Sequence, residues 1–202
     1  MKTGFPEGVS NNQYARYLYY VGRIKAVQLE YSEAQASLIQ SQRKGPEIGA
    51  LGFRIAVQKL LVIVTLLMGE IPSRQIFDQA EFKKPLYPYF LIVNYVKQGD
   101  MDKFKQLLQK YSAIFQADKV LSLVHRLQHT VIKFGLKKIN ISYSKISLKD
   151  VKAKLSLESV EETEQIVAKA IRDGVIDASI DHDNQCMLSL PLTDVYSSND
   201  PQ

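Results

Sequence analysis

Between Ile146 and Leu190, apolar residues recur first at helical spacing and then at every second position. Two sets share a spacing that puts each on one face of a helix: Leu148, Val151 and Leu155, then Val160, Val167 and Ile171. The pattern therefore predicts two amphipathic helices followed by short strands.

Capping residues mark where both helices begin. Ser147 with Asp150, and Ser159 with Glu162, have the spacing at which a hydroxyl and an acid satisfy the first backbone amides of a helix. Only residues 156–158 separate the two helices, and so short a link favours helix-turn-helix geometry over an antiparallel hairpin. Gly174 suits the left-handed end of the second helix.

Two alternating runs follow and predict a wing of two strands. The residues expected to share the apolar phase are Ile176, Ala178 and Ile180, then Cys186, Leu188 and Leu190. Residues 182–184 are polar and join the runs as a hairpin. The segment thus reads as a winged helix, in which Cys186 is expected to be a small buried residue.

Upstream, the pattern predicts helices separated by breaks suited to antiparallel pairs. The expected helices span 13–30, 32–44 (capped by Ser32), 50–68, 85–99, a short one capped by Asp100, and a long one over 117–136. Each is too small to bury its own apolar face, which is typical of a solenoid. The predicted fold is mainly α: a right-handed helical-repeat solenoid followed by a winged helix with a small antiparallel sheet.

This reading divides the chain into four parts. We expect a flexible leader over 1–12, helical repeats with a long connecting helix over 13–138, a winged helix over 139–192 and a flexible tail over 193–202. The first five residues lack the apolar core of a secretory signal, and the start looks like one added to an excised fragment.

Composition narrows the class of protein. With 202 residues, 46% of them hydrophobic, the chain can bury a substantial core. One cysteine excludes an internal disulfide and favours the cytosol or nucleus. The longest apolar stretch, 60–68, has about half the length that a membrane-spanning helix needs.

Charge is unevenly distributed along the chain. Residues 1–138 hold 20 Lys and Arg against 10 Asp and Glu, whereas 139–202 hold 6 against 11. A set of lysines flanks the predicted junction between the long helix and the winged helix, and we call it the lysine patch: Lys133, Lys137, Lys138, Lys145, Lys149, Lys152 and Lys154. It is either a solvated basic face, a site for an acidic protein partner, or a phosphate-binding surface for nucleic acid.

Many winged helices read DNA with their second helix, so nucleic-acid binding is the alternative function. Here that helix and its lead-in hold Glu158, Glu161, Glu162, Glu164 and Asp173 against Lys169 and Arg172. Acids at this position repel a duplex, whose phosphates need cations. Any nucleic-acid contact is therefore expected at the lysine patch.

Other chemistry has little support. His125 and His129 have the spacing of a zinc pair, but no third ligand is evident, and packing or hydrogen bonding between helices is the favoured interpretation. Gly49 and Gly52 lack the remaining features of a phosphate loop. We predict no catalytic residue, metal, cofactor or small-molecule substrate, and no membrane contact.

Three segments resemble a known family. They are YYVGRIKAVQLEYSEAQASLIQSQRK (19–44), YFLIVNYVKQGDMDKF (89–104), and KISLKDVKAKL with EQIVAKAIRDGVIDASID within 145–181. They are similar to PCI-domain subunits of the proteasome lid. The resemblance implies a non-catalytic scaffold for ubiquitin-dependent proteolysis in cytoplasm and nucleus. Its implied partners are other PCI-containing lid subunits, with the small acidic lid protein as a further candidate.

The wing suggests how such a scaffold makes contacts. A two-stranded wing leaves unpaired backbone groups that a neighbouring chain can complete by adding a strand. Because Ile176 and Ile180 are expected to face inward, the candidate contact residues are those predicted to face outward: Asp177, Ser179, Asp181, Met187 and Ser189.

Overall fold

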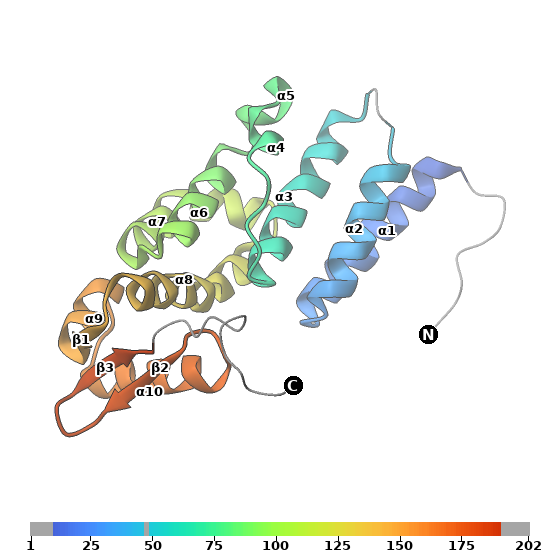
Figure 1. Cartoon of the computed structure of the whole chain (residues 1–202). Coiled ribbons are helices and arrows are strands. Elements are labelled where there is room, and N and C mark those ends of the chain that lie inside the picture. Colours follow the sequence, from blue (N-terminus) through green and yellow to red (C-terminus); the bar gives the residue numbers. More distant parts are fainter. Residues whose placement is uncertain (1–9, 47–48, 191–202) are drawn as a thin grey trace, which may run out of the picture. The chain divides into compact units, whose positions relative to one another are not determined.

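The computed structural model describes residues 10–46 and 49–190, which are mainly helical with a small sheet near the end (Figure 1). The chain divides into two compact units, described separately below. Of the described residues, the first comprises 10–46, 49–96 and 104–130, and the second comprises 97–103 and 131–190. No described helix is long and apolar enough to cross a membrane.

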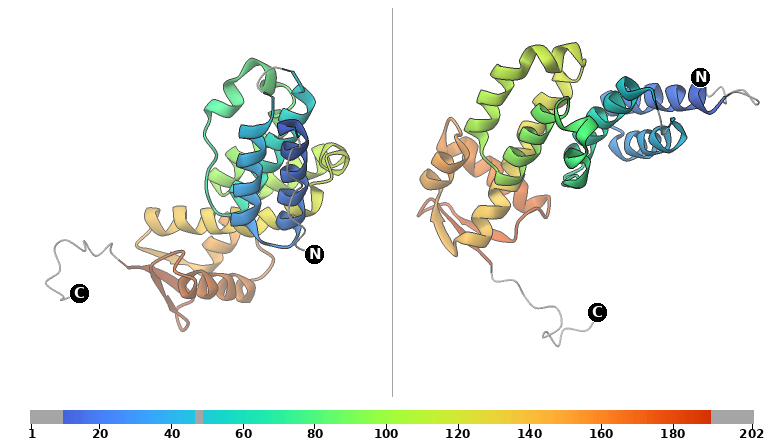
Figure 2. Two further views of the ribbon diagram at one scale, coloured as in Figure 1. Left: turned by 90° about the vertical axis from the view of Figure 1, so that its right-hand side faces the viewer. Right: turned by 90° about the horizontal axis from the view of Figure 1, so that it is seen from above.

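The first unit is built from antiparallel helices. Its elements are α1 (Asn11–Val27), α2 (Tyr31–Lys44), α3 (Leu51–Leu67), the short α4 (Gln75–Asp78) and α5 (Ala80–Lys83), most of α6 (Tyr87–Gln98) and α7 (Met101–Ala117), and the start of α8 (Leu121–Ser142). Helices α1 and α2 pack along each other, as Figure 2 shows from two further directions. Gly22 permits this packing, because a Cβ there would lie 2.9 Å from Cγ of Leu38.

Most of the predicted helices are present, with changes at their ends. The cap predicted at Asp100 is confirmed, because its Oδ1 accepts a hydrogen bond from the backbone N–H of Lys103 at 3.0 Å. The cap predicted at Ser32 is wrong: α2 begins at Tyr31, and Glu30 precedes it without a side-chain cap. The helix after Asp100 is not short, since α7 has 17 residues.

The long helix predicted over 117–136 is interrupted at its start. Helix α7 continues to Ala117, and α8 begins only at Leu121 and runs to Ser142. Between them Lys119 has a φ of 56°, a left-handed conformation that ends helical hydrogen bonding. No glycine or proline marks this break in the sequence.

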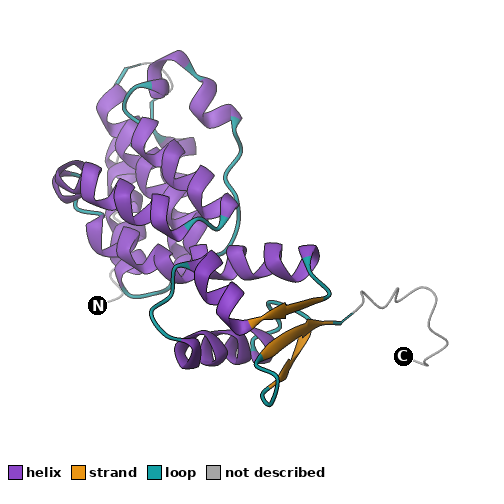
Figure 3. Cartoon of the chain, turned by 90° about the vertical axis from the view of Figure 1, so that its left-hand side faces the viewer, coloured by secondary structure: helices purple, strands orange, loops and turns teal. Residues whose placement is uncertain are grey.

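The second unit contains the predicted winged helix. Its elements in chain order are β1 (Lys145–Ser147), α9 (Leu148–Leu155), α10 (Val160–Arg172), β2 (Ala178–Asp181) and β3 (Cys186–Ser189). The strands form one antiparallel sheet in the order β1-β3-β2 (Figure 3). The helical solenoid and winged helix are confirmed, but the sheet has three strands where the sequence predicted two.

A single apolar core holds this unit together. Side chains from α9, α10 and all three strands meet in it, including Val151, Leu155, Val167, Ala178 and Met187. The spacing that predicted the two amphipathic helices is thus explained, since both turn their apolar faces toward one side of the sheet.

Candidate protein-interaction surface of the winged helix

Hydrogen-bonded caps begin both helices of the winged helix. Ser147 Oγ accepts the backbone N–H of Asp150 at 3.1 Å and donates to Asp150 Oδ2 at 2.8 Å. Ser159 Oγ accepts the N–H of Glu162 at 3.0 Å. Both predicted caps are confirmed, and they determine where α9 and α10 start relative to the sheet.

The inner side of the sheet has a different composition from the predicted one. Ile146, Met187 and Ile180 are aligned across β1, β3 and β2, and Met187 is fully buried in the core. Met187 therefore cannot belong to an exposed contact surface, and that prediction is wrong. Cys186, predicted to be buried, is only half-buried because β3 has the opposite phase.

The outer face of the sheet is the side turned away from α9 and α10. Register places Lys145 beside Leu188 and Ser179, and Ser147 beside Cys186 and Asp181. A bond from the N–H of Leu190 to the carbonyl of Asp177 extends this face by one more pair. Three predicted contact residues, Asp177, Ser179 and Asp181, thus lie together on the outer face.

Ser189 does not join them. It has the phase of Met187, its hydroxyl donates to the carbonyl oxygen of Tyr143 at 2.6 Å, and its N–H donates to the carbonyl of Ser144 at 2.9 Å. Ser189 therefore joins the end of β3 to the segment before β1 by two hydrogen bonds. Its predicted place on the outward face is wrong.

Strand β2 is an edge of the sheet. The hydrogen bond from Leu190 N–H to the carbonyl of Asp177 shows that the backbone groups of Asp177 point toward β3. Because these groups alternate in direction along an antiparallel strand, the N–H and C=O groups of Ala178 and Ile180 point away from β3. Among the described strands β2 pairs with β3 alone. Strand β1 is the other edge. By the same alternation, the N–H and C=O groups of Lys145 and Ser147 point away from β3.

The turn between β2 and β3 is held by charged groups. Asp181 accepts hydrogen bonds from the backbone and side-chain amides of Asn184, which hold the pKa of Asp181 below its ordinary value. His182 Nδ1 lies 2.7 Å from Glu164 Oε1 of α10. This hydrogen bond and the carboxylate charge raise the pKa of His182.

The structure brings together part of the lysine patch. Tyr143, 40% exposed, and Lys154 line two neighbouring hollows, one shared with Lys138 and the other with Lys145. Lys154 Nζ also lies 5.2 Å from the ring centre of Tyr143. Lys133, Lys137, Lys149 and Lys152 line neither of these hollows, and Lys152 is half-buried.

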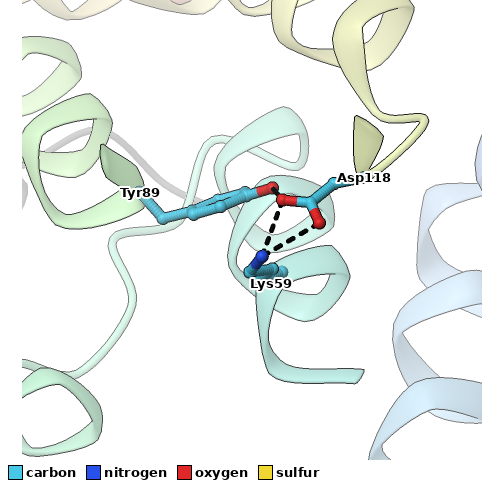
Figure 4. A network of polar contacts seen from close by, with 3 residues as sticks. All are labelled: Lys59, Tyr89 and Asp118. Carbon is cyan, nitrogen blue, oxygen red and sulfur yellow. Dashed lines mark hydrogen bonds and ion pairs between the residues drawn. The ribbon is translucent and has the colours of Figure 1, made fainter. Parts of the chain in front are cut away.

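A polar network in the first unit was not predicted. The carboxylate of Asp118, between α7 and α8, accepts hydrogen bonds from Lys59 Nζ of α3 at 2.7 and 2.9 Å and from the hydroxyl of Tyr89 of α6 at 2.8 Å (Figure 4). Burial and the adjacent carboxylate hold the pKa of Tyr89 far above its ordinary value. Its three residues are at least 29 positions apart in the sequence, and no local motif indicates that they meet.

Residues 10–46 and 49–190 contain no group of three or more side chains that could hold a metal ion. His125 and His129 are exposed on α8, so they do not pack in a core, and hydrogen bonding between helices stays a prediction. A hydroxyl, a lysine and a carboxylate do meet in the network around Asp118. There they bind one another.

Comparison with known families agrees with this architecture. Residues 1–93 match the family described as PSMD3-like, N-terminal TPR repeats, and residues 108–190 match the PCI domain. The chain is therefore a PCI-domain protein with helical repeats before its winged helix.

Similar proteins narrow the class. A 26S proteasome non-ATPase regulatory subunit 3 homolog of Arabidopsis thaliana is 51% identical over 97% of this chain, and the probable regulatory subunit rpn3 of Schizosaccharomyces pombe is 52% identical over 100%. The Anopheles stephensi subunit 3 is 47% identical over 100%. The chain belongs to this subunit 3 family. It spans about two-fifths of the length of these relatives, 41%, 41% and 40% respectively.

Proposed function

We propose that this chain is a non-catalytic scaffold and assembly module of the proteasome regulatory particle lid, acting in ubiquitin-dependent protein degradation in cytoplasm and nucleus. The names of its relatives, which are regulatory non-ATPase subunits, support this role. The PCI domain supports contacts with other PCI-containing lid subunits. The small acidic lid protein is a further candidate partner for the basic half of the chain.

The observation that carries the proposal is the outer edge of β2. Ala178 and Ile180 direct donors and acceptors away from β3, which is the arrangement that an incoming strand completes. Asp177 and Ser179 are exposed beside this edge and contribute side-chain contacts to the added strand. In this proposal a neighbouring lid subunit extends the sheet from β2.

Proline substitution tests the edge directly. Ala178→Pro removes an outward-facing N–H while leaving the hydrogen bonds between β2 and β3 in place. We expect this variant to bind a PCI-containing lid subunit at least ten-fold more weakly, as measured by titration with each purified subunit. Lys145→Pro tests the opposite edge, because it removes an outward N–H from β1, and Lys145→Ala beside it accounts for the loss of the lysine side chain.

These variants separate the two edges. Equal binding by the parent and Ala178→Pro, with both melting at the same temperature, would reject strand addition at β2. Loss of binding in Lys145→Pro, with binding retained in Lys145→Ala and Ala178→Pro, would move the contact to β1. A circular dichroism spectrum of each variant establishes that the winged helix is folded.

The second candidate function is nucleic-acid binding at the lysine patch. Its support is the gathering of Lys138, Lys145 and Lys154 around an exposed aromatic ring, Tyr143. Phosphates and bases are recognised by this combination of groups. Binding to single-stranded and duplex probes should then weaken steeply with salt and be lost in Lys145→Glu with Lys154→Glu. Tight binding that is insensitive to salt excludes it.

A further inference from the structure

The outer face of the sheet has an unusual centre. Antiparallel sheets with one side on a core normally place polar residues on the other side. Here the central strand β3 has Cys186 and Leu188 on its outer side, and Leu190 follows directly after the strand in the same phase; none of the three is fully buried, and Leu190 is 54% exposed. These three residues form an apolar row along the middle of a solvent-facing surface.

Charges of opposite sign border this row. On the β1 side, Lys145 is exposed, and Lys154 of α9 lines the same open hollow of about 530 Å³. On the β2 side lie Asp177 and Asp181. Asp150, an acid that also lines the hollow, is engaged by the Ser147 cap.

An apolar row between a basic and an acidic border matches one kind of partner. An amphipathic helix has an apolar stripe with polar residues on both sides, and it lies well along the strands of a sheet. Carboxylates on one side of its stripe would face Lys145 and Lys154, and cations on the other side would face Asp177 and Asp181. The two borders thereby orient the helix, because turning it around brings like charges together.

We propose that the outer face of the sheet is a second docking surface, which binds an amphipathic helix of another lid subunit through Leu188 and Leu190. This inference rests on the proposed function, because a scaffold subunit that joins two different neighbours needs two different contact surfaces. The edge of β2 offers one surface. The outer face offers the other, with side-chain packing in place of backbone pairing.

The test uses the full chain and purified PCI-containing lid subunits, each added separately. Leu188→Glu places a charge in the centre of the apolar row, and Leu190→Ser is a milder change at a more exposed position. We expect at least a ten-fold loss of affinity for one subunit with Leu188→Glu and a smaller loss with Leu190→Ser. Lys145→Glu should weaken the same complex.

Ile141→Glu is the matched control. Ile141 is 82% exposed at the end of α8 and belongs to none of the three strands, so its replacement should leave binding unchanged. Melting temperatures of all variants should equal that of the parent within a few degrees. Hydrogen exchange of the bound subunit should show new protection in a helix, whereas protection confined to an extended segment overturns the proposal.

The outcomes distinguish this surface from the β2 edge. If Ala178→Pro weakens binding to a subunit while Leu188→Glu and Leu190→Ser bind every subunit as the parent does, strand addition stands and the outer-face proposal fails. If the face variants lose binding while Ala178→Pro retains it, the reverse holds. Light scattering that shows Leu188→Glu abolishing only self-association would assign the face to a second copy of this chain and reject a partner helix.

Discussion

The hydroxyl of Tyr89 donates to Asp118 Oδ2 at 2.8 Å, and this bond joins the middle of the helical core to the turn between α7 and α8. Tyr89 is fully buried, and its ring packs edge-on against Phe115 at a centroid distance of 5.6 Å. The same carboxylate holds Lys59. Asp118 is therefore anchored by two helices at the position where the chain leaves the helical path.

Replacing Asp118 should destabilise the first unit more than removing the hydroxyl of Tyr89. Asp118→Ala leaves a buried phenol and a partly buried ammonium without their acceptor, at a cost of about 2–3 kcal/mol. Tyr89→Phe removes one hydrogen bond while Lys59 keeps its partner, and should cost about 1 kcal/mol. Urea unfolding measures both. Equal effects would show that the hydroxyl, and not the shared carboxylate, holds the turn.

Alkaline pH should also reveal this bond. The pKa of Tyr89 is raised in the folded protein, so the protonated phenol contributes its full stabilisation below the unfolded pKa of about 10. This contribution is lost as the pH rises above the unfolded pKa. The unfolding free energy of the parent should therefore fall between pH 9 and 11 more steeply than that of Tyr89→Phe. Parallel slopes for the two proteins would contradict the raised pKa.

Gly99 and Gly135 should resist substitution because their backbones are in contact. A Cβ on Gly99 would lie 2.4 Å from the Cα of Gly135, and one on Gly135 would lie 2.5 Å from Cδ2 of the buried Leu155. We expect a loss of about 1–3 kcal/mol for Gly135→Ala. Gly99→Ala should lose more, because its clash is with backbone and its φ is +69°.

Gly52 is the control for these two glycines. It lies in the first turn of α3, and a Cβ there would meet nothing within 4 Å. Gly52→Ala should leave stability unchanged or raise it by up to about 1 kcal/mol through helix propensity. Thermal unfolding of the three variants should therefore order them Gly52→Ala, Gly135→Ala and Gly99→Ala, from most to least stable.

Two serines that look alike in sequence should behave differently. Ser159→Ala removes the hydroxyl that accepts the N–H of Glu162 and should cost about 1 kcal/mol. Ser32 lies inside α2 without capping it, so Ser32→Ala should change stability little, or raise it slightly. A loss of 1 kcal/mol in Ser32→Ala would indicate that α2 begins later in solution.

His182 should titrate above its ordinary range. Its hydrogen bond to Glu164 raises the pKa, so the contact contributes fully below the unfolded pKa of about 6.5 and is lost as the pH rises through the folded value. Nuclear magnetic resonance should show a raised pKa for His182 in the parent and an ordinary one in Glu164→Gln. An unchanged titration curve would indicate that the wing turn does not contact α10.

Local patterns in the sequence determined the helices of the winged helix and the positions where they begin. The caps at Ser147 and Ser159 need only residues three positions away, so sequence alone contains the whole interaction. The apolar faces of α9 and α10 follow from helical spacing in the same way. These elements were predicted because their causes are local.

The tertiary structure decided what no local pattern specifies. Cys186, Met187 and Leu188 are consecutive apolar residues, so alternation alone leaves the phase of β3 open, and pairing of Met187 with Ile146 and Ile180 selects it. Strand β1 exists because β3 pairs with it. The break between α7 and α8 lies where Asp118 meets Lys59 and Tyr89. Contacts between residues distant in sequence, which form only on folding, thus determine the exposed face and edge of the sheet.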